Sequence, residues 1–320
     1  MAIQWFPGHM HKARKEIKKV MSEIDVVIEV LDARIPFSSS NPMIKSLKGN
    51  KPCIKLLNKA DLADAEMVKH WQNFFEQDSQ TKTLALSANA MNAKGLSASK
   101  SAIANLCRKL APHRVGTDKA IHAMIMGIPN VGKSTLINAL AGRAIAKVGN
   151  EPAVTKRQQK INLDNGIILS DTPGVLWPKL EPESCGYRLA ATGAIKDTAM
   201  EYEPVACFTL DYLRSTYPDR LCARFKLDPE QLEQYSSSAE LLNLIGTKRG
   251  CLRSGGIVDE HQAATIVLNE LRSGKLGAIC LETPEMMQEE MAVFLAELEA
   301  RRASENSQSD LDLDEASDTP

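Results

Sequence analysis

Short apolar runs alternate with stretches of helical spacing along the first half of the chain. Residues 25–32 form an apolar run of strand length, and residues 65–77 repeat their apolar positions with the period of a helix. The same patterns predict strands at 52–57, 83–86, 121–126, 159–163 and 166–170, and helices at 9–24, 97–110 and 133–141. Strands that alternate with helices are typical of an α/β domain with a mostly parallel sheet.

The pattern changes after Trp177 and Pro178. From about residue 183 to 272 the spacing is helical, and a helix-like piece follows at 284–302. Residues 304–320 are acidic, rich in serine and free of aromatic residues, and we expect them to be disordered. The predicted organisation is an α/β domain over 1–178, a small all-helical domain over 179–285, and a helix-like segment with an acidic tail over 286–320.

The distribution of charge is uneven, although the formal net charge of the 320 residues is only −1. Residues 1–180 hold 26 Lys and Arg against 14 Asp and Glu. Residues 181–285 hold 11 against 16, and residues 286–320 hold 2 against 10. The basic first half is therefore a candidate surface for a polyanion.

Membrane and secreted classes find no support in the sequence. No apolar run reaches the roughly 18 residues that a membrane span needs, and the N-terminus has no secretory apolar region. The seven cysteines are scattered and form no C-x-x-C pair. We expect buried free thiols, a cytoplasmic protein and no membrane partner.

One motif is typical of loops that bind nucleotide phosphates. Residues 127–135 read GIPNVGKST and match the phosphate-loop pattern G-x-x-x-x-G-K-[ST], between a predicted strand and a predicted helix. Backbone N–H groups of such a loop surround phosphate oxygens, Lys133 reaches the β- and γ-phosphates, and the Ser134 hydroxyl is a magnesium ligand. The residues expected to line the nucleotide here are Asn130, Val131, Gly132, Lys133, Ser134 and Thr135.

Two further segments fit a magnesium nucleotide. Asp171 ends an apolar strand in the sequence DTPG, where it can hold magnesium, and the N–H of Gly174 can contact the γ-phosphate. Thr155 lies in the loop between the two motifs. A threonine there can ligate magnesium only when the γ-phosphate is present, which makes it a sensor of the nucleotide state.

The base is predicted from Asn58-Lys59-Ala60-Asp61, an N-K-x-D motif directly after a predicted strand. The carboxylate of Asp61 can accept hydrogen bonds from N1–H and the 2-amino group of guanine, and adenine offers neither donor. The stem of Lys59 can lie over the ring, and Asn58 can tether loops. A backbone N–H of Ser87-Ala88-Asn89, which follows the next strand, can meet guanine O6.

The order of these motifs is unusual, because the base motif precedes the phosphate loop. In the common GTPases the phosphate loop comes first. The motifs can occupy equivalent places in space only if the domain is circularly permuted. The loop after Asp171 then runs through Trp177 and Pro178 directly into the helical domain, so we expect the nucleotide state to act on that domain.

Several motifs together resemble the YlqF/RbgA family, the ribosome biogenesis GTPase A type of circularly permuted GTPases. They are QWFPGHM at 4–10, DARIP at 32–36, the motifs at 58 and 127, DTPGVLWP at 171–178, TGAIK at 192–196 and KRGCL at 248–252. The resemblance covers about residues 1–280. It implies a GTPase that uses GTP and magnesium, acts late in assembly of the large ribosomal subunit, and contacts rRNA through its helical domain.

Hydrolysis needs a group that orients water, and Val175 stands where Ras-like enzymes carry glutamine. The resemblance points to His9 in the Pro-Gly-His-Met turn as the catalytic residue; the alternative is a capping or surface histidine. The resemblance also implies that Asn130 helps to bind a potassium ion, the alternative being ordinary loop packing.

The partner is expected to be the large ribosomal subunit or its precursor, with no DNA. Basic residues on the first helix and beside Thr155 are candidate phosphate contacts, which would be salt-sensitive and largely independent of sequence. Lys248, Arg249 and Arg253 are further candidates. The alternative function is a regulatory GTP/GDP-sensing module that binds RNA or protein, in which hydrolysis is incidental. A tRNA-modifying or membrane-transport GTPase would need catalytic or transmembrane sequence that we do not find.

Overall fold

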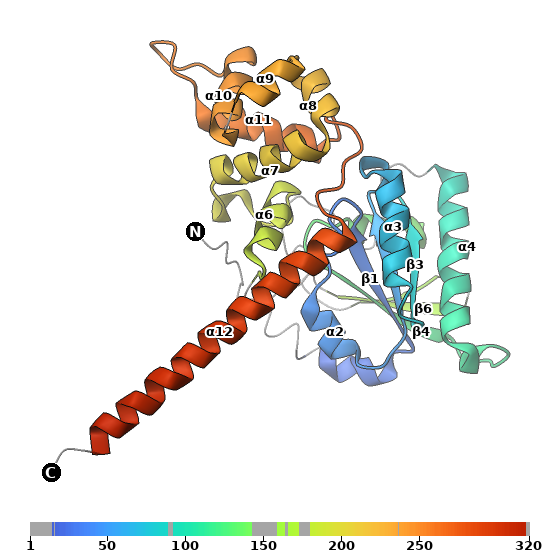
Figure 1. Ribbon diagram of the computed structural model, residues 1–320. Coiled ribbons are helices and arrows are strands. Elements are labelled where there is room, and N and C mark those ends of the chain that lie inside the picture. Colours follow the sequence, from blue (N-terminus) through green and yellow to red (C-terminus); the bar gives the residue numbers. More distant parts are fainter. Residues whose placement is uncertain are drawn as a thin grey trace.

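Six strands form one twisted sheet at the centre of the α/β part of the molecule (Figure 1). The computed structural model describes residues 17–88, 92–142, 159–163, 166–172, 180–235 and 237–317, together with Lys15. The strands are β1 (Val26–Asp32), β2 (Cys53–Asn58), β3 (Thr81–Ala85), β4 (Ile121–Gly127), β5 (Gln159–Asn162) and β6 (Ile167–Asp171). Their order is β3-β2-β1-β4-β6-β5, and every neighbouring pair is parallel except β5 with β6. This confirms the mostly parallel α/β sheet.

Besides the helical residues 15 and 17–20, four helices accompany the described part of the sheet: α2 (Pro42–Lys48), α3 (Ala65–Phe75), α4 (Ala93–Leu110) and α5 (Lys133–Ala141). Of these, α2 lies in a stretch for which the sequence pattern predicts no helix. It begins there because Asn41 accepts a hydrogen bond from the N–H of Met43 and Pro42 occupies the first turn. The side chain of Asp64 caps α3 in the same manner.

The chain then enters a group of helices, as the sequence predicts. They are α6 (Glu183–Ala191), α7 (Tyr202–Thr216), α8 (Pro218–Phe225), α9 (Pro229–Gln234), α10 (Ser238–Lys248) and α11 (Glu260–Arg272). Helix α11 packs against α7 and α10, and α6 packs against α7. We refer to α6–α11 as the helical part.

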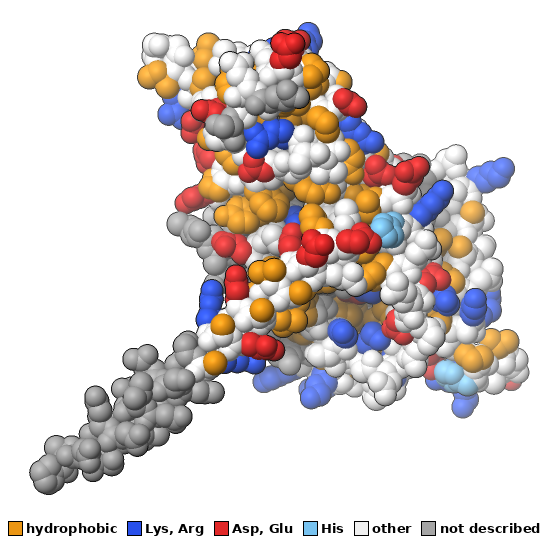
Figure 2. All heavy atoms as spheres, viewed as in Figure 1, with side chains coloured by type: hydrophobic (Ala, Val, Ile, Leu, Met, Phe, Trp, Pro, Cys, Tyr) orange, Lys and Arg blue, Asp and Glu red, His pale blue; other side chains and the backbone are white. Residues whose placement is uncertain are grey.

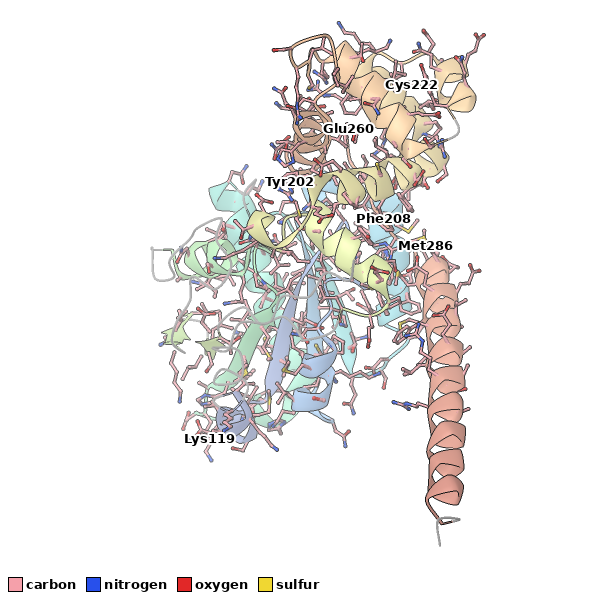
Figure 3. All side chains as sticks on the ribbon, turned by 90° about the vertical axis from the view of Figure 1, so that its left-hand side faces the viewer. Lys119, Tyr202, Phe208, Cys222, Glu260 and Met286 are labelled. Atoms are coloured by element: carbon pink, nitrogen blue, oxygen red, sulfur yellow. The ribbon has the colours of Figure 1, made fainter. Side chains whose placement is uncertain are left out.

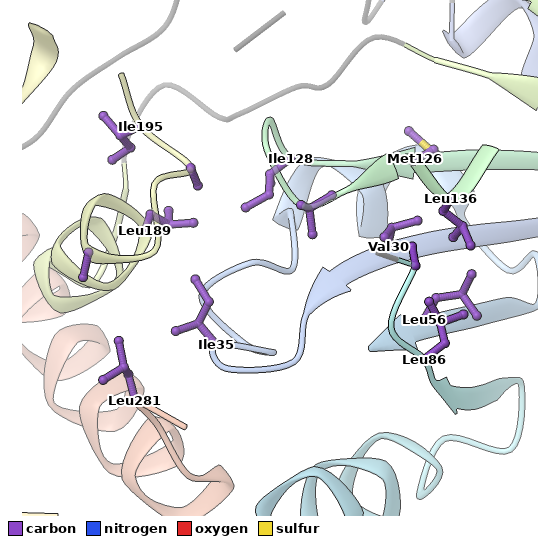
Figure 4. Close-up of a cluster of buried hydrophobic side chains, with 14 of the residues drawn as sticks. Val30, Ile35, Leu56, Leu86, Met126, Ile128, Leu136, Leu189, Ile195 and Leu281 are labelled. Carbon is purple, nitrogen blue, oxygen red and sulfur yellow. The ribbon is translucent and has the colours of Figure 1, made fainter. Parts of the chain in front are cut away.

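One continuous apolar core joins the helical part to the sheet. Figure 4 shows Val30 and Leu56 among the strands, and Leu189 of α6 and Leu281 at the other end of the same cluster. All four side chains are essentially inaccessible to solvent. The two parts are therefore packed together rather than merely linked.

After α11 the chain returns to the α/β part as an extended strap, which we define as residues 276–283. The N–H of Ile279 donates to the carbonyl of Leu62 at 2.9 Å, and the N–H of Leu281 donates to the carbonyl of Arg34 at 2.8 Å. The strap thus adds backbone hydrogen bonds between parts that are far apart in sequence.

The strap ends in α12 (Pro284–Ser317), which projects from the body (Figure 1). Met287 in its first turns is buried, and Glu290 pairs with Arg188. The helix continues through the segment for which the sequence predicts disorder. Its residues after Pro284 include no glycine and no proline before Pro320, and many are strong helix formers.

All seven cysteines are free thiols, five of them buried. Burial raises the pKa of Cys53, Cys107, Cys185 and Cys280 to about 12, which makes these thiols unreactive. Within the described residues, no helix combines the length and the apolar character that crossing a bilayer requires.

Candidate nucleotide site

The motifs that the sequence singles out meet at one edge of the sheet. Asp32, Asn58, Gly127 and Asp171 are the last residues of β1, β2, β4 and β6, and these strands run parallel. Because the connections from β1 and β4 lead to opposite sides of the sheet, this topology predicts a crevice between their carboxyl ends. Ligands of open α/β sheets bind at such a point.

The phosphate loop joins β4 to α5, and two of its glycines are required by close contacts. A Cβ at Gly127 would lie 2.9 Å from the carbonyl oxygen of Val30. Gly132 has a φ of 90°, and a Cβ there would collide with Nδ2 of Asn58. The loop therefore lies close to the neighbouring strands and delivers the N-terminus of α5 to the crevice, a favourable place for an anion.

Lys133 and Asp171 form a buried ion pair beside this loop, with Nζ donating to Oδ1. The side chain of Lys133 is 5% exposed and that of Asp171 is inaccessible. Burial lowers the pKa of Lys133 and raises the pKa of Asp171, because both charges have lost water. Each charge is maintained mainly by the other.

The second oxygen of Asp171, Oδ2, is buried and has no hydrogen-bond partner among the residues that the structure describes. Buried oxygens without partners are costly. Hard divalent cations prefer oxygen ligands, so this oxygen fits a magnesium ion held at Asp171, next to a lysine suited to phosphate.

The base motif is tied to the phosphate loop through Asn58. Its Nδ2 donates to the carbonyl of Val131 at 2.8 Å, across 73 residues of sequence, and its Oδ1 accepts from the N–H of Ala88 at 3.0 Å. The N–H of Asp61 donates to Oγ of Ser87 at 2.9 Å, while the Asp61 residue itself is exposed. Asn58 thus gathers three loops around one crevice and leaves the Asp61 carboxylate at its rim.

Lys59 adopts a left-handed backbone conformation, with a φ of 61°. Its Nζ donates to Oδ2 of Asp32 at 2.9 Å. In the sequence, Asp32 stands out only as the first residue of the DARIP motif. Lys59 follows β2 whereas Asp32 ends β1, and no short-range pattern indicates their pairing.

Asn130, within the phosphate loop, also has a positive φ, of 58°. Its Nδ2 donates to the carbonyl of Gly193 at 2.8 Å, so the loop contacts the turn that follows α6. Ser134 and Thr135 occupy the first turn of α5, and both are partly buried. Of the other predicted site residues, His9, Asn89, Thr155 and Gly174 lie outside the described residues, as does Val175.

The basic residues expected to contact phosphates in the helical part are engaged within it. Nη2 of Arg249 lies 3.1 Å from Oε1 of Glu270, and Nε of Arg253 lies 2.9 Å from Oδ2 of Asp259. Nζ of Lys248 donates to a backbone carbonyl at 2.6 Å. An RNA phosphate would have to compete with these partners.

The chain is similar to known GTPases over most of its length. A family model described as "50S ribosome-binding GTPase" matches residues 122–237. Ribosome biogenesis GTPase A of Priestia megaterium is 46% identical over 290 residues, which cover 89% of this chain and 98% of that protein. The Thermotoga maritima protein of the same name is 30% identical, with 88% and 95% covered.

Solved structures give the same result. The GDP-bound structure titled TM YlqF superposes with a TM-score of 0.60 at 26% identity, covering 84% of this chain and 99% of that one. GNP-bound YlqF from T. maritima superposes with a TM-score of 0.57 at 27% identity, covering 86% and 99%.

The sheet, the phosphate loop after β4 and the N-K-x-D turn after β2 define a circularly permuted GTPase. Within that class, the sequence identity to ribosome biogenesis GTPase A proteins extends over nearly the whole chain. The chain belongs to the ribosome biogenesis GTPase A family.

Proposed function

We propose that this GTPase is a switch protein required for a late step in assembly of the large ribosomal subunit, and that the ribosomal particle stimulates its hydrolysis of GTP. The observation that carries the nucleotide part is the double hydrogen bond of Asn58, which holds the base motif against the phosphate loop. The names of the relatives carry the ribosomal part.

In this proposal each motif has one task at the nucleotide. Asp61 reads guanine, Lys59 covers the ring, and a backbone N–H of 87–89 meets O6. Lys133 and the loop amides of 130–135 hold the phosphates, and Gly174 contacts the γ-phosphate. Magnesium, which neutralises charge on the β- and γ-oxygens when bound, is assigned to Ser134, Asp171 and Thr155.

Two further roles concern the rate of hydrolysis. His9 orients water, since Val175 cannot hydrogen-bond it. Asn130 contributes to a potassium site, and its hydrogen bond to Gly193 fixes the direction of the amide. A monovalent cation at the phosphates supplies positive charge of the kind that an arginine finger supplies elsewhere.

The proposed partner is the large ribosomal subunit or its precursor, contacted through rRNA in the cytoplasm. Lysine and arginine side chains are frequent around α2 (Figure 2). Lys15, Lys18 and Lys19, in the helical residues that precede β1, are exposed. These residues are better placed for phosphate contacts than the paired arginines of the helical part.

Co-sedimentation with purified large subunits tests the proposal. We expect the full chain to sediment with large subunits in the presence of a non-hydrolysable GTP analogue and to be largely released with GDP. Equal retention in both states would contradict a nucleotide switch. Retention that is switched by nucleotide but accompanied by no ribosome-stimulated turnover would favour the regulatory sensing module instead.

A further inference from the structure

The carboxylate of Asp32 accepts hydrogen bonds from two cationic side chains, Lys59 beside the base motif and Arg34 beside the helical part. Its oxygens accept from Nζ of Lys59 at 2.9 Å, and from Nε and Nη2 of Arg34 at 2.9 and 2.7 Å. Asp32 is only 3% exposed, and the two positive charges hold its pKa well below the usual range despite the burial. A buried, ionised anchor therefore stands at the end of β1, in the wall of the crevice.

Toward the nucleotide, this anchor determines where Lys59 lies. A free lysine side chain loses rotamer entropy when it is fixed in one conformation. With Nζ bonded to Asp32, the stem is fixed before a base arrives. Preorganisation of this kind strengthens binding because the ordering cost is removed from the binding step.

Away from the nucleotide, Arg34 connects the same carboxylate to the helical part. Its guanidinium is buried, and Nη1 donates to the carbonyl of Leu271 in the last turn of α11 at 3.4 Å. The carbonyl of Arg34 accepts from Leu281 of the strap. Arg34 thus contacts the end of β1, the last turn of α11 and the strap.

A second connection reaches the same turn of α11 from the phosphate loop. Asn130 bonds to the carbonyl of Gly193, and a Cβ on Gly193 would lie 3.4 Å from Nε of Arg272. Arg272 follows Leu271 and donates to the carbonyls of Ala190 and Ala191 at 2.8 and 3.1 Å. The base motif, through Asp32 and Arg34, and the phosphate loop, through Asn130 and Gly193, are therefore both connected to the last turn of α11.

We propose that Asp32 is a positioning residue of the nucleotide site, which holds Lys59 in place for the base and, through Arg34, links nucleotide affinity to the seating of the last turn of α11 and the strap. The inference rests on the proposed guanine site. Coupling between two sites is reciprocal. Bound nucleotide should accordingly stabilise the strap.

Equilibrium binding of fluorescently labelled GDP to the full chain tests the positioning role. We expect Asp32→Asn to weaken binding at least tenfold. Asp25→Asn is the matched control, because Asp25 is a largely buried, arginine-paired carboxylate just before the opposite end of β1. We expect it to bind labelled GDP within twofold of the wild type. Binding by Asp32→Asn within twofold of the wild type, or equal losses in both variants, would overturn the proposal.

Hydrogen exchange at the Leu281 and Ile279 amides tests the coupling. GDP should slow their exchange at least threefold in the wild type. Arg34→Lys keeps a cation near Asp32 but has no guanidinium to reach Leu271, so we expect GDP to have no such effect in it. A slowing by GDP that is equal in the two proteins, or absent in the wild type, would overturn the coupling.

Two additions keep the result unambiguous. If Asp32→Asn does not fold, the double variant Asp32→Asn/Arg34→Met removes the buried guanidinium left without a partner, and the same tenfold loss is expected. Asp61→Asn tests the guanine site itself. This variant should bind xanthosine diphosphate more tightly than GDP. If the wild type does not bind GDP, or Asp61→Asn leaves the preference unchanged, the proposed guanine site fails; if only the Asp32 variants behave like the wild type, this inference alone fails.

Discussion

Nζ of Lys133 donates to Oδ1 of Asp171, and both groups are buried although 38 residues separate them. A cation and an anion are therefore in direct contact at the place proposed for phosphate and magnesium. Removal of one partner leaves the other charge buried and uncompensated.

Asp171→Asn should consequently destabilise the nucleotide-free chain, by about 3 kcal/mol of unfolding free energy. It should also abolish the strengthening of GTP binding by magnesium. Urea unfolding and GTP titrations with and without magnesium measure the two effects. The double variant Lys133→Met/Asp171→Asn should regain most of the stability but not the binding, and a single variant as stable as the wild type would contradict the ion-pair argument.

Asn58→Ala should open the contact between the base motif and the phosphate loop. It leaves the carbonyl of Val131 and the N–H of Ala88 without their partner, at a cost of about 3 kcal/mol in unfolding free energy. Nucleotide affinity should fall as well. Asn105→Ala, on the exposed face of α4, is the control and should change stability by less than about 0.5 kcal/mol. Similar losses in the two variants would refute the special role of Asn58.

Glu282 of the strap predicts a pH dependence. It is fully buried, accepts from the N–H groups of Phe37 and Ser38 at 2.5 and 3.0 Å, and lies 3.9 Å from Nε of Arg188. Burial raises the pKa of this carboxyl above its ordinary value of 4.5. The folded state then binds more protons than the unfolded state between pH 4.5 and the raised pKa, so this group lowers stability as the pH rises through that window.

Glu282→Gln should remove this contribution, because the amide carries no charge while its oxygen can still accept from the N–H groups of Phe37 and Ser38, as Oε1 does. The stability of the variant relative to the wild type should increase as the pH rises from about 4.5, in chemical denaturation at a series of pH values. A difference that does not vary with pH would show that the Glu282 carboxyl does not titrate differently in the folded state.

Potassium should accelerate hydrolysis if Asn130 helps to bind it. We expect GTP turnover to be several-fold faster in potassium than in sodium chloride at equal ionic strength, and this difference should disappear in Asn130→Ala. Equal rates in the two salts would refute the potassium site and leave the hydrogen bond to Gly193 as the role of this side chain.

The sequence predicts contiguous features of this molecule well. The strand before the phosphate loop and the helix after it are expected at 121–126 and 133–141 and lie at Ile121–Gly127 and Lys133–Ala141. Their apolar spacing and glycines are local properties. Helix α2 escapes prediction because its Asn-Pro start resembles a turn and it has only seven residues.

Interactions between segments that are distant in the chain cannot be predicted from the sequence in this way. Glu282 accepts a hydrogen bond from Ser38 across 244 residues, and a single glutamate between Leu281 and Thr283 carries no indication of its partner. The sequence around Arg188 likewise does not indicate its partners, although this side chain lies against Phe208 and donates to Glu290. Figure 3 shows Phe208 on α7 and Met286 at the start of α12. Only the folded chain shows that these residues join the helical part to the α/β part.

Steady-state GTP turnover by the full chain, with and without purified large ribosomal subunits, tests the central claim most directly. We expect large subunits to raise turnover at least tenfold. His9→Ala should lose most of this stimulation while its affinity for GTP stays nearly that of the wild type. Turnover that is the same with and without large subunits would contradict the account of a ribosome-stimulated switch.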